Sequence, residues 1–144
     1  MIKRILVPLD GRESSEAVLP VVNALTREGA AVRLLRVFPL PERIVVANGR
    51  TIAYVDQEMA RLTGAGLAEL RPLEARLSEV PVEKVVRFGD AASEILLEAE
   101  AFGADLVVLS AKARGWIRRA LTSGVAERVA RQSAIPTLVL QHLA

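Results

Sequence analysis

The chain has 144 residues, 51% hydrophobic and 25% charged, a length and balance typical of one soluble globular domain spanning residues 1–144 rather than a disordered chain. Lysine plus arginine exceed aspartate plus glutamate by only 19 to 17, and aromatic residues make up 3%, which argues against a nucleic-acid partner. The absence of cysteine and the single His142 exclude disulfides, a cysteine nucleophile and a histidine metal cluster.

The N-terminal run Ile2–Pro8 is mostly apolar and leads into a turn at residues 8–11, which predicts a buried parallel strand. The run begins without a signal peptide, and no apolar run in the chain reaches the roughly 18 residues that span a bilayer. We therefore expect a cytoplasmic protein without a membrane partner. Ser14 or Ser15 can cap the helix that follows, and Pro20 predicts a kink or a late start of that helix.

The central part of the chain predicts one strand and one long helical region. Ala31–Phe38 has the apolar character of a second strand. Residues Thr51–Leu77 follow a helical pattern, and a break or bend is expected where Gly64, Gly66 and Pro72 interrupt it.

The C-terminal part alternates strands and helices. The expected elements are a strand at Val82–Phe88, a helix at Ala91–Ala101, a strand at Asp105–Leu109, a helix at Val125–Gln132 and a strand at Thr137–Gln141. The whole chain thus alternates five strands with four helices, which predicts an α/β fold with a doubly wound, mostly parallel sheet and helices on both faces.

In such a sheet, ligands bind beyond the carboxyl ends of the strands, where the strand order reverses. Asp10 ends the first strand and Ser110 follows the fourth, so the two residues converge if those strands are neighbours. The Asp10 carboxylate can accept hydrogen bonds from a base or a ribose. It is equally compatible with an ordinary turn aspartate that caps backbone amides.

The segment from Ser110 to Gly124 joins the fourth strand to a helix, which is where α/β proteins hold phosphates. Its only glycines are Gly115 and Gly124, and it lacks both GxxxxGK[ST] and GxGxxG. Small residues such as Ala113 let backbone N–H groups approach phosphates, but a tight connection in which Ser123 only caps the next helix fits as well. Four cations in this segment can neutralise phosphates or form a solvated surface: Lys112, Arg114, Arg118 and Arg119.

Five stretches, in their order and spacing, resemble the universal stress protein family over nearly the whole chain. They are Ile5–Gly11, Leu34–Val37, Gly89–Leu109, Val125–Val129 and Ile135–Val139. The resemblance implies a five-stranded sheet of order 3-2-1-4-5, of the adenine nucleotide alpha-hydrolase-like kind. It also implies a homodimer, in which the last strands of two copies pair through Thr137, Leu138, Val139, Leu140 and Gln141.

ATP-binding members of that family carry G-x2-G-x9-G-[ST] after the fourth strand. The corresponding positions here are Ser110, Ala113, Ser123 and Gly124, which are all small but all depart from the pattern. The base and ribose side of the family's site corresponds to Pro8, Asp10 and Val37, which are compatible with that role. With Arg114 and Val125, these positions form the candidate nucleotide-binding set.

We therefore expect a non-enzymatic stress-response homodimer that acts through contacts with unidentified protein partners and binds ATP weakly or not at all. The sequence contains no recognisable catalytic constellation and no metal-ligand cluster. The alternative is an ATP or AMP sensor that uses the altered loop at residues 110–124. A nucleotide hydrolase is a third reading, in which Asp10 is the only plausible general base.

Overall fold

The computed structural model describes residues 1–10, 12–41, 54–77, 79–113 and 124–143. The elements alternate along the described chain as β1 (Arg4–Pro8), α1 (Arg12–Leu25), β2 (Ala31–Phe38), α2 (Tyr54–Ala75), β3 (Val82–Phe88), α3 (Ala91–Phe102), β4 (Leu106–Ala113), α5 (Val125–Gln132) and β5 (Thr137–Leu143). Among the described helices, none is long and apolar enough to cross a bilayer.

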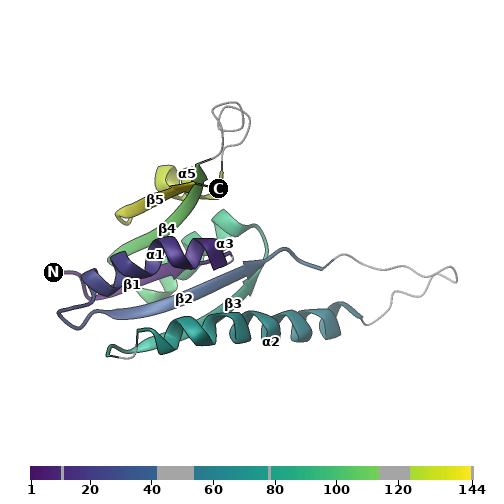
Figure 1. The fold of residues 1–144 in the computed structure, drawn as a ribbon. Helices are drawn as coiled ribbons and strands as arrows, with labels where there is room; N and C mark the ends of the chain where they lie inside the picture. Colours follow the sequence, from purple (N-terminus) through teal and green to yellow (C-terminus); the bar gives the residue numbers. More distant parts are fainter. Residues whose placement is uncertain (11, 42–53, 78, 114–123, 144) are drawn as a thin grey trace, which may run out of the picture.

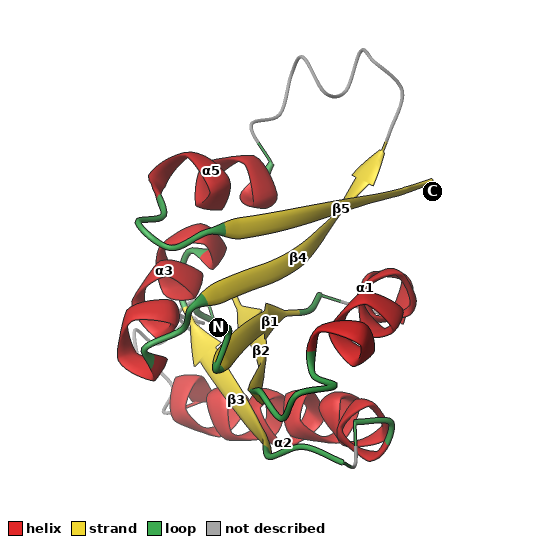
Figure 2. Ribbon diagram, turned by 90° about the vertical axis from the view of Figure 1, so that its left-hand side faces the viewer, coloured by secondary structure: helices red, strands yellow, loops and turns green. Residues whose placement is uncertain are grey.

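The five strands form one parallel sheet in the order β3-β2-β1-β4-β5 (Figure 1). The predicted fold class and strand order are thereby confirmed. Helices α1 and α2 cover one face of the sheet, and α3 and α5 cover the other (Figure 2). β1 lies at the centre because its residues are apolar on both faces, and Ile5, Leu6 and Val7 are fully buried.

Alternation along β1 divides the core into two layers. Ile5 and Val7 face α1 and α2, where they join a cluster that is completed by Val18, Val22, Val32, Leu34, Leu70 and Leu73, among others. Leu6 faces α3 and α5, in a cluster with Leu35, Ile95, Ala99, Val107, Leu109 and Val129, among others. Each layer is apolar because a parallel sheet is covered by helices on both sides.

Two helices differ from their expected form. α1 begins at Arg12, so Ser14 and Ser15 lie inside the helix and neither is its N-cap. Both α1 and α2 continue through a proline, Pro20 and Pro72 respectively. Each of these prolines is on the exposed side of its helix, where water can bond the backbone carbonyl that the proline leaves without a donor.

α2 is also continuous through Gly64 and Gly66, where a break or a bend was expected, so there is no break. The strands β4 and β5 are longer than predicted, because they end at Ala113 and Leu143 rather than at residues 109 and 141. The added residues of β4 pair with the end of β5, from Ser110 opposite Leu140 to Ala113 opposite Leu143. Ser110 and Ala113 therefore belong to a strand and not to the loop in which they were expected.

Candidate functional site

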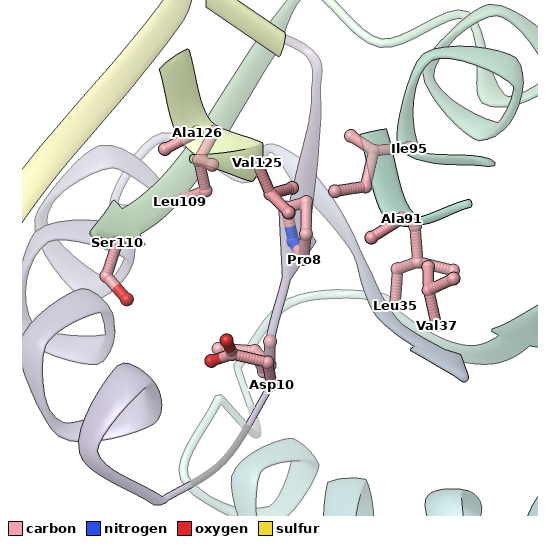
Figure 3. A pocket seen from close by; sticks show the side chains of 11 residues that line it. Pro8, Asp10, Leu35, Val37, Ala91, Ile95, Leu109, Ser110, Val125 and Ala126 are labelled. Carbon is pink, nitrogen blue, oxygen red and sulfur yellow. The ribbon is translucent and has the colours of Figure 1, made fainter. Parts of the chain in front are cut away.

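A pocket opens at the carboxyl ends of β1 and β4, where the strand order reverses. These strands are neighbours, with Ile5 opposite Leu106 and Leu6 opposite Val107, so Asp10 and Ser110 come to line the same cavity. The pocket has a volume of about 80 Å³ and is partly open to solvent. Figure 3 shows the side chains that line it.

The floor and walls of the pocket are mainly apolar. Pro8 and Leu9 come from the end of β1, and Leu35 and Val37 from β2, while Leu109 comes from β4. The helices contribute the remaining apolar lining, with Ala91 and Ile95 at the start of α3 and Val125 and Ala126 at the start of α5. Such a lining suits the face of a planar or aliphatic group rather than a free ion.

Two polar side chains complete the lining, Asp10 and Ser110. In Figure 3 they lie on the same side of the pocket, away from the α3 wall formed by Ala91 and Ile95. Asp10 is exposed and Ser110 is half-buried. A carboxylate and a hydroxyl beside an apolar slot can hydrogen-bond a ligand that is apolar on its face and polar at its edge.

The first turns of α3 and α5 face the pocket with different caps. α3 is capped by Asp90, whose Oδ2 accepts a hydrogen bond from the Ser93 N–H at 3.1 Å. The Arg128 guanidinium and the Ser93 donors lower the pKa of Asp90 to about 2. α5 has Gly124 at its N-cap, with no side-chain acceptor for the first N–H groups of the helix. The first residues of α5, Val125 and Ala126, line the pocket, so the partial positive charge of this helix N-terminus lies beside it.

The candidate residues from the sequence divide into three groups. Those that line the pocket are Pro8, Asp10, Val37, Ser110 and Val125. Gly124 is the N-cap of α5 and is not among the described lining residues, and Ala113 ends β4. Arg114 and Ser123 lie outside the described residues. The N-cap of α5 is Gly124 rather than the expected Ser123.

Sequence reasoning missed six lining residues: Leu9, Leu35, Ala91, Ile95, Leu109 and Ala126. Leu35 could have been predicted from the alternation of side chains along a strand, since it is two residues before Val37 and must share its face of the sheet. Ala91 is the first residue of a helix that follows the turn at Gly89, which has φ +141°. Its place at the pocket depends on a tertiary contact that no local pattern encodes.

The described residues of the pocket offer groups that can bind a ligand. Among them, no group of three or more histidine, aspartate or glutamate side chains could hold a metal ion. Asp10 is the one carboxylate among the residues that line the pocket. The described part of the site therefore contains a hydrogen-bond acceptor, a hydroxyl and an apolar slot, but no paired carboxylates.

Comparison with known proteins identifies relatives of this chain. The model of the universal stress protein family matches residues 1–141. Among solved structures, the hypothetical protein MJ0577 is 26% identical with a TM-score of 0.79, covering 99% of this chain and 97% of that chain. No curated protein matches the sequence significantly.

Two further similar structures were solved with adenine nucleotides. A universal stress protein in complex with cAMP is 19% identical, with a TM-score of 0.70 and coverage of 97% of each chain. The universal stress protein from Archaeoglobus fulgidus in complex with dAMP is also 19% identical, with a TM-score of 0.62, and covers 97% of this chain and 99% of that chain. At these identities the likeness concerns the fold.

Proposed function

Because the chain belongs to the universal stress protein family, we propose that it is a non-enzymatic regulatory protein whose pocket binds an adenine mononucleotide and binds ATP only weakly. Its output is contact with other proteins. The observation that carries the proposal is the convergence of Pro8, Asp10 and Val37 on one pocket at the reversal of strand order.

The base and ribose half of a nucleotide fits the described lining. Leu35, Val37 and Ile95 offer an apolar surface for the face of a base. Asp10 stands at the end of β1, where its carboxylate can accept a hydrogen bond from a ribose hydroxyl. Proteins of the same fold have been solved with cAMP and dAMP, which supports the choice of an adenine ring as the ligand group.

The backbone at the start of the phosphate segment argues against tight binding of a triphosphate. Ser110 and Ala113 stand where ATP-binding members have glycines, and both belong to β4 in extended conformation. The Val107 N–H donates to the Pro136 carbonyl, so by the alternation of a parallel ladder the Ala113 N–H also points toward β5 and cannot turn toward phosphates. Among the described residues, no residue other than glycine has a positive φ.

Hydrolysis of a bound nucleotide finds little support in the described lining. Asp10 is exposed and has no second carboxylate among its pocket neighbours. A general base and a metal or cation at the phosphates are the usual means of phosphoryl transfer. Lysine and arginine side chains such as those of Lys112 and Arg114 are protonated at neutral pH and do not by themselves supply a base. We therefore expect no phosphate release above the uncatalysed rate.

Calorimetric titration of AMP, Mg²⁺–ATP and GMP into the purified protein tests the proposal. We expect AMP to bind at least as tightly as ATP, and ATP to bind more weakly than about 10 μM, which corresponds to about 7 kcal/mol. GMP should bind more weakly than AMP. ATP binding tighter than this limit, or steady phosphate release, would overturn the proposal.

Asp10→Asn separates the pocket from adventitious nucleotide binding elsewhere. The amide keeps the size of the side chain but replaces a charged acceptor, so we expect a loss of AMP affinity of about three- to tenfold. Asp56→Asn is the matched control, since Asp56 is an exposed aspartate in the first turn of α2 and does not line the pocket. Equal affinity of both variants for AMP would place the nucleotide elsewhere.

A further inference from the structure

The two walls of the pocket come from helices that are distant in the sequence. One wall is the start of α3, with Ala91 and Ile95, and the other is the start of α5, with Val125 and Ala126. The width of the pocket therefore depends on how α5 is held against α3. The two helices contact each other on the same face of the sheet (Figure 2).

α3 is firmly anchored. It has 12 residues, of which five are buried, and both of its ends are capped. Asp90 caps its first turn, and Gly103, with φ +68°, closes its last turn by donating its N–H to Ala99 and Glu100. The α3 wall is thus fixed by its own contacts with the sheet and by its caps.

α5 has fewer contacts of its own. It has eight residues, and only Ala126 and Val129 are buried. Its N-cap is Gly124, which provides no side-chain acceptor, and the pocket-lining Val125 is 40% exposed. The N-terminal turn of α5 is therefore the less constrained of the two walls.

One ion pair joins these two walls directly. Arg128 Nη1 donates to Asp90 Oδ1 at 3.1 Å across 38 positions of sequence. The Asp90 carboxylate is held in place on α3, because its other oxygen, Oδ2, accepts from the Ser93 N–H at 3.1 Å and from the Ser93 hydroxyl at 2.7 Å. Arg128 is three residues after Val125, so the two side chains share one face of α5.

We propose that Arg128 is a positioning residue of the pocket, which through Asp90 holds the first turn of α5 against the first turn of α3 and so sets where Val125 stands opposite Ala91. Its effect on ligand affinity rests on the proposed nucleotide function, whereas its effect on the position of α5 does not. The α3 cap serves as the fixed point from which the shorter helix is held.

The test compares Arg128→Gln with Arg131→Gln. Arg131 is exposed on the same helix and has no ion pair with a described residue, so it controls for the loss of a charge from α5. Hydrogen exchange is measured at the amides of residues 128–133, and affinity is measured for AMP and for adenosine. A partly exposed ion pair predicts exchange about two- to fivefold faster in Arg128→Gln, and affinity lower by a similar factor.

Adenosine separates positioning from simple charge attraction. If Arg128 acts by positioning, Arg128→Gln weakens adenosine and AMP by the same factor, and Arg128→Lys restores both in part. A loss confined to AMP would instead mean that the guanidinium attracts the phosphate, and would overturn the proposal. Asp90→Asn should reproduce the Arg128→Gln effect on affinity, since asparagine caps a helix as well as aspartate but carries no charge.

The two measurements keep this inference distinct from the proposed function. If the wild-type protein binds neither AMP nor adenosine, the nucleotide function fails, and hydrogen exchange decides the inference alone. Unchanged exchange at residues 128–133 in Arg128→Gln would overturn it. If the wild-type protein does bind, faster exchange in Arg128→Gln together with unchanged ligand affinity would also overturn the inference, because the ion pair would then not shape the pocket.

Discussion

Gly66 shows at the scale of one residue how closely α2 approaches the sheet. A β-carbon added there would lie 2.9 Å from both Phe38 Cε2 and Val86 Cγ2. The Phe38 ring has little room to move, because it stacks on Phe88 at 6.0 Å and lies under the Arg36 guanidinium at 4.3 Å. The glycine that weakens the helical pattern in the sequence is therefore a packing requirement of the fold.

Gly66→Ala should destabilise the protein, and Gly64→Ala should not. The clash at residue 66 costs about 1–3 kcal/mol, which outweighs a gain of up to about 1 kcal/mol from better helix propensity. At Gly64, two residues earlier in the same helix, an added β-carbon meets nothing within 4 Å, so only the gain remains. Urea denaturation of both variants measures the difference, and equal shifts of the two midpoints would refute the close contact.

Asp90 makes the stability of the fold depend on pH in a defined window. Its pKa is lowered from 3.8 to about 2 by Arg128 and by the Ser93 donors, so the folded state binds its proton less readily than the unfolded chain does. This contribution is complete above about pH 4 and is lost as the pH falls toward 2. The Tm advantage of wild type over Asp90→Asn should shrink across that window in thermal melts at pH 6, 4, 3 and 2. A constant advantage would contradict it.

At the scale of the element, charged groups hold α3 to the neighbouring strands β2 and β3. Glu98 is buried, with 5% of its side chain exposed, and accepts from Arg33 of β2 at 2.6 Å and from Arg87 of β3 at 2.9 Å. The Arg33 guanidinium also lies over the Phe102 ring at 4.2 Å. Burial lowers the pKa of Arg33, but its hydrogen bonds to Glu98 and Glu83 raise it above the usual value. The hydrogen bond to Glu98 raises the pKa of Arg87 against the effect of burial, and Glu94 beside Arg87 adds to this rise.

Removing Glu98 leaves two partly buried guanidinium groups without their shared carboxylate. We expect Glu98→Ala to lower the free energy of unfolding by about 2–4 kcal/mol, less than for a fully buried pair because Arg87 is partly exposed. Glu100→Ala is the matched control, since Glu100 is exposed on the same helix. Chemical denaturation monitored by circular dichroism gives both values. A loss at Glu98 no larger than at Glu100 would show that the ion pairs are dispensable.

The elements that could be predicted from the sequence are those whose signals are local. β2 and β3 have their predicted bounds because each is rich in valine, leucine or phenylalanine and is closed by proline or glycine. The end of β4 was predicted too early, because residues 110–113 are in a strand only through their pairing with residues 140–143. The start of α1 was predicted too late, because a serine that could cap a helix can also lie within one.

The candidate site was predictable in part. Asp10 and Val37 follow from strand ends and from the family pattern, and both line the pocket. The α3 wall of the pocket could not be predicted, because a pocket residue such as Ile95 has the same periodic apolar pattern as a core residue. The ion pair between Asp90 and Arg128 could not be predicted either, because no local sequence pattern indicates a contact across 38 positions.

At the scale of the whole molecule, the sheet has two edges in the described chain, and they differ in charge. β3 carries Glu83, Lys84 and Arg87, and charges of this kind discourage pairing with another chain. β5, with the sequence TLVLQHL, carries no acidic or strongly basic residue, and Leu138 is 37% exposed. This contrast supports our proposal that β5 is where two copies of the chain pair.

Val139→Pro should separate the dimer without unfolding the sheet. The Val107 N–H donates to the Pro136 carbonyl at 3.0 Å and Val107 pairs with Thr137, so by the alternation of a parallel ladder the Val139 N–H points away from β4. Proline there removes a donor only from the outer edge. Light scattering at micromolar concentration should give a wild-type dimer and a monomeric variant, with similar circular dichroism. Leu140→Pro, which removes a donor to β4, should instead destabilise the sheet. A wild-type monomer would refute the dimer, and a dimeric Val139→Pro would place the interface elsewhere.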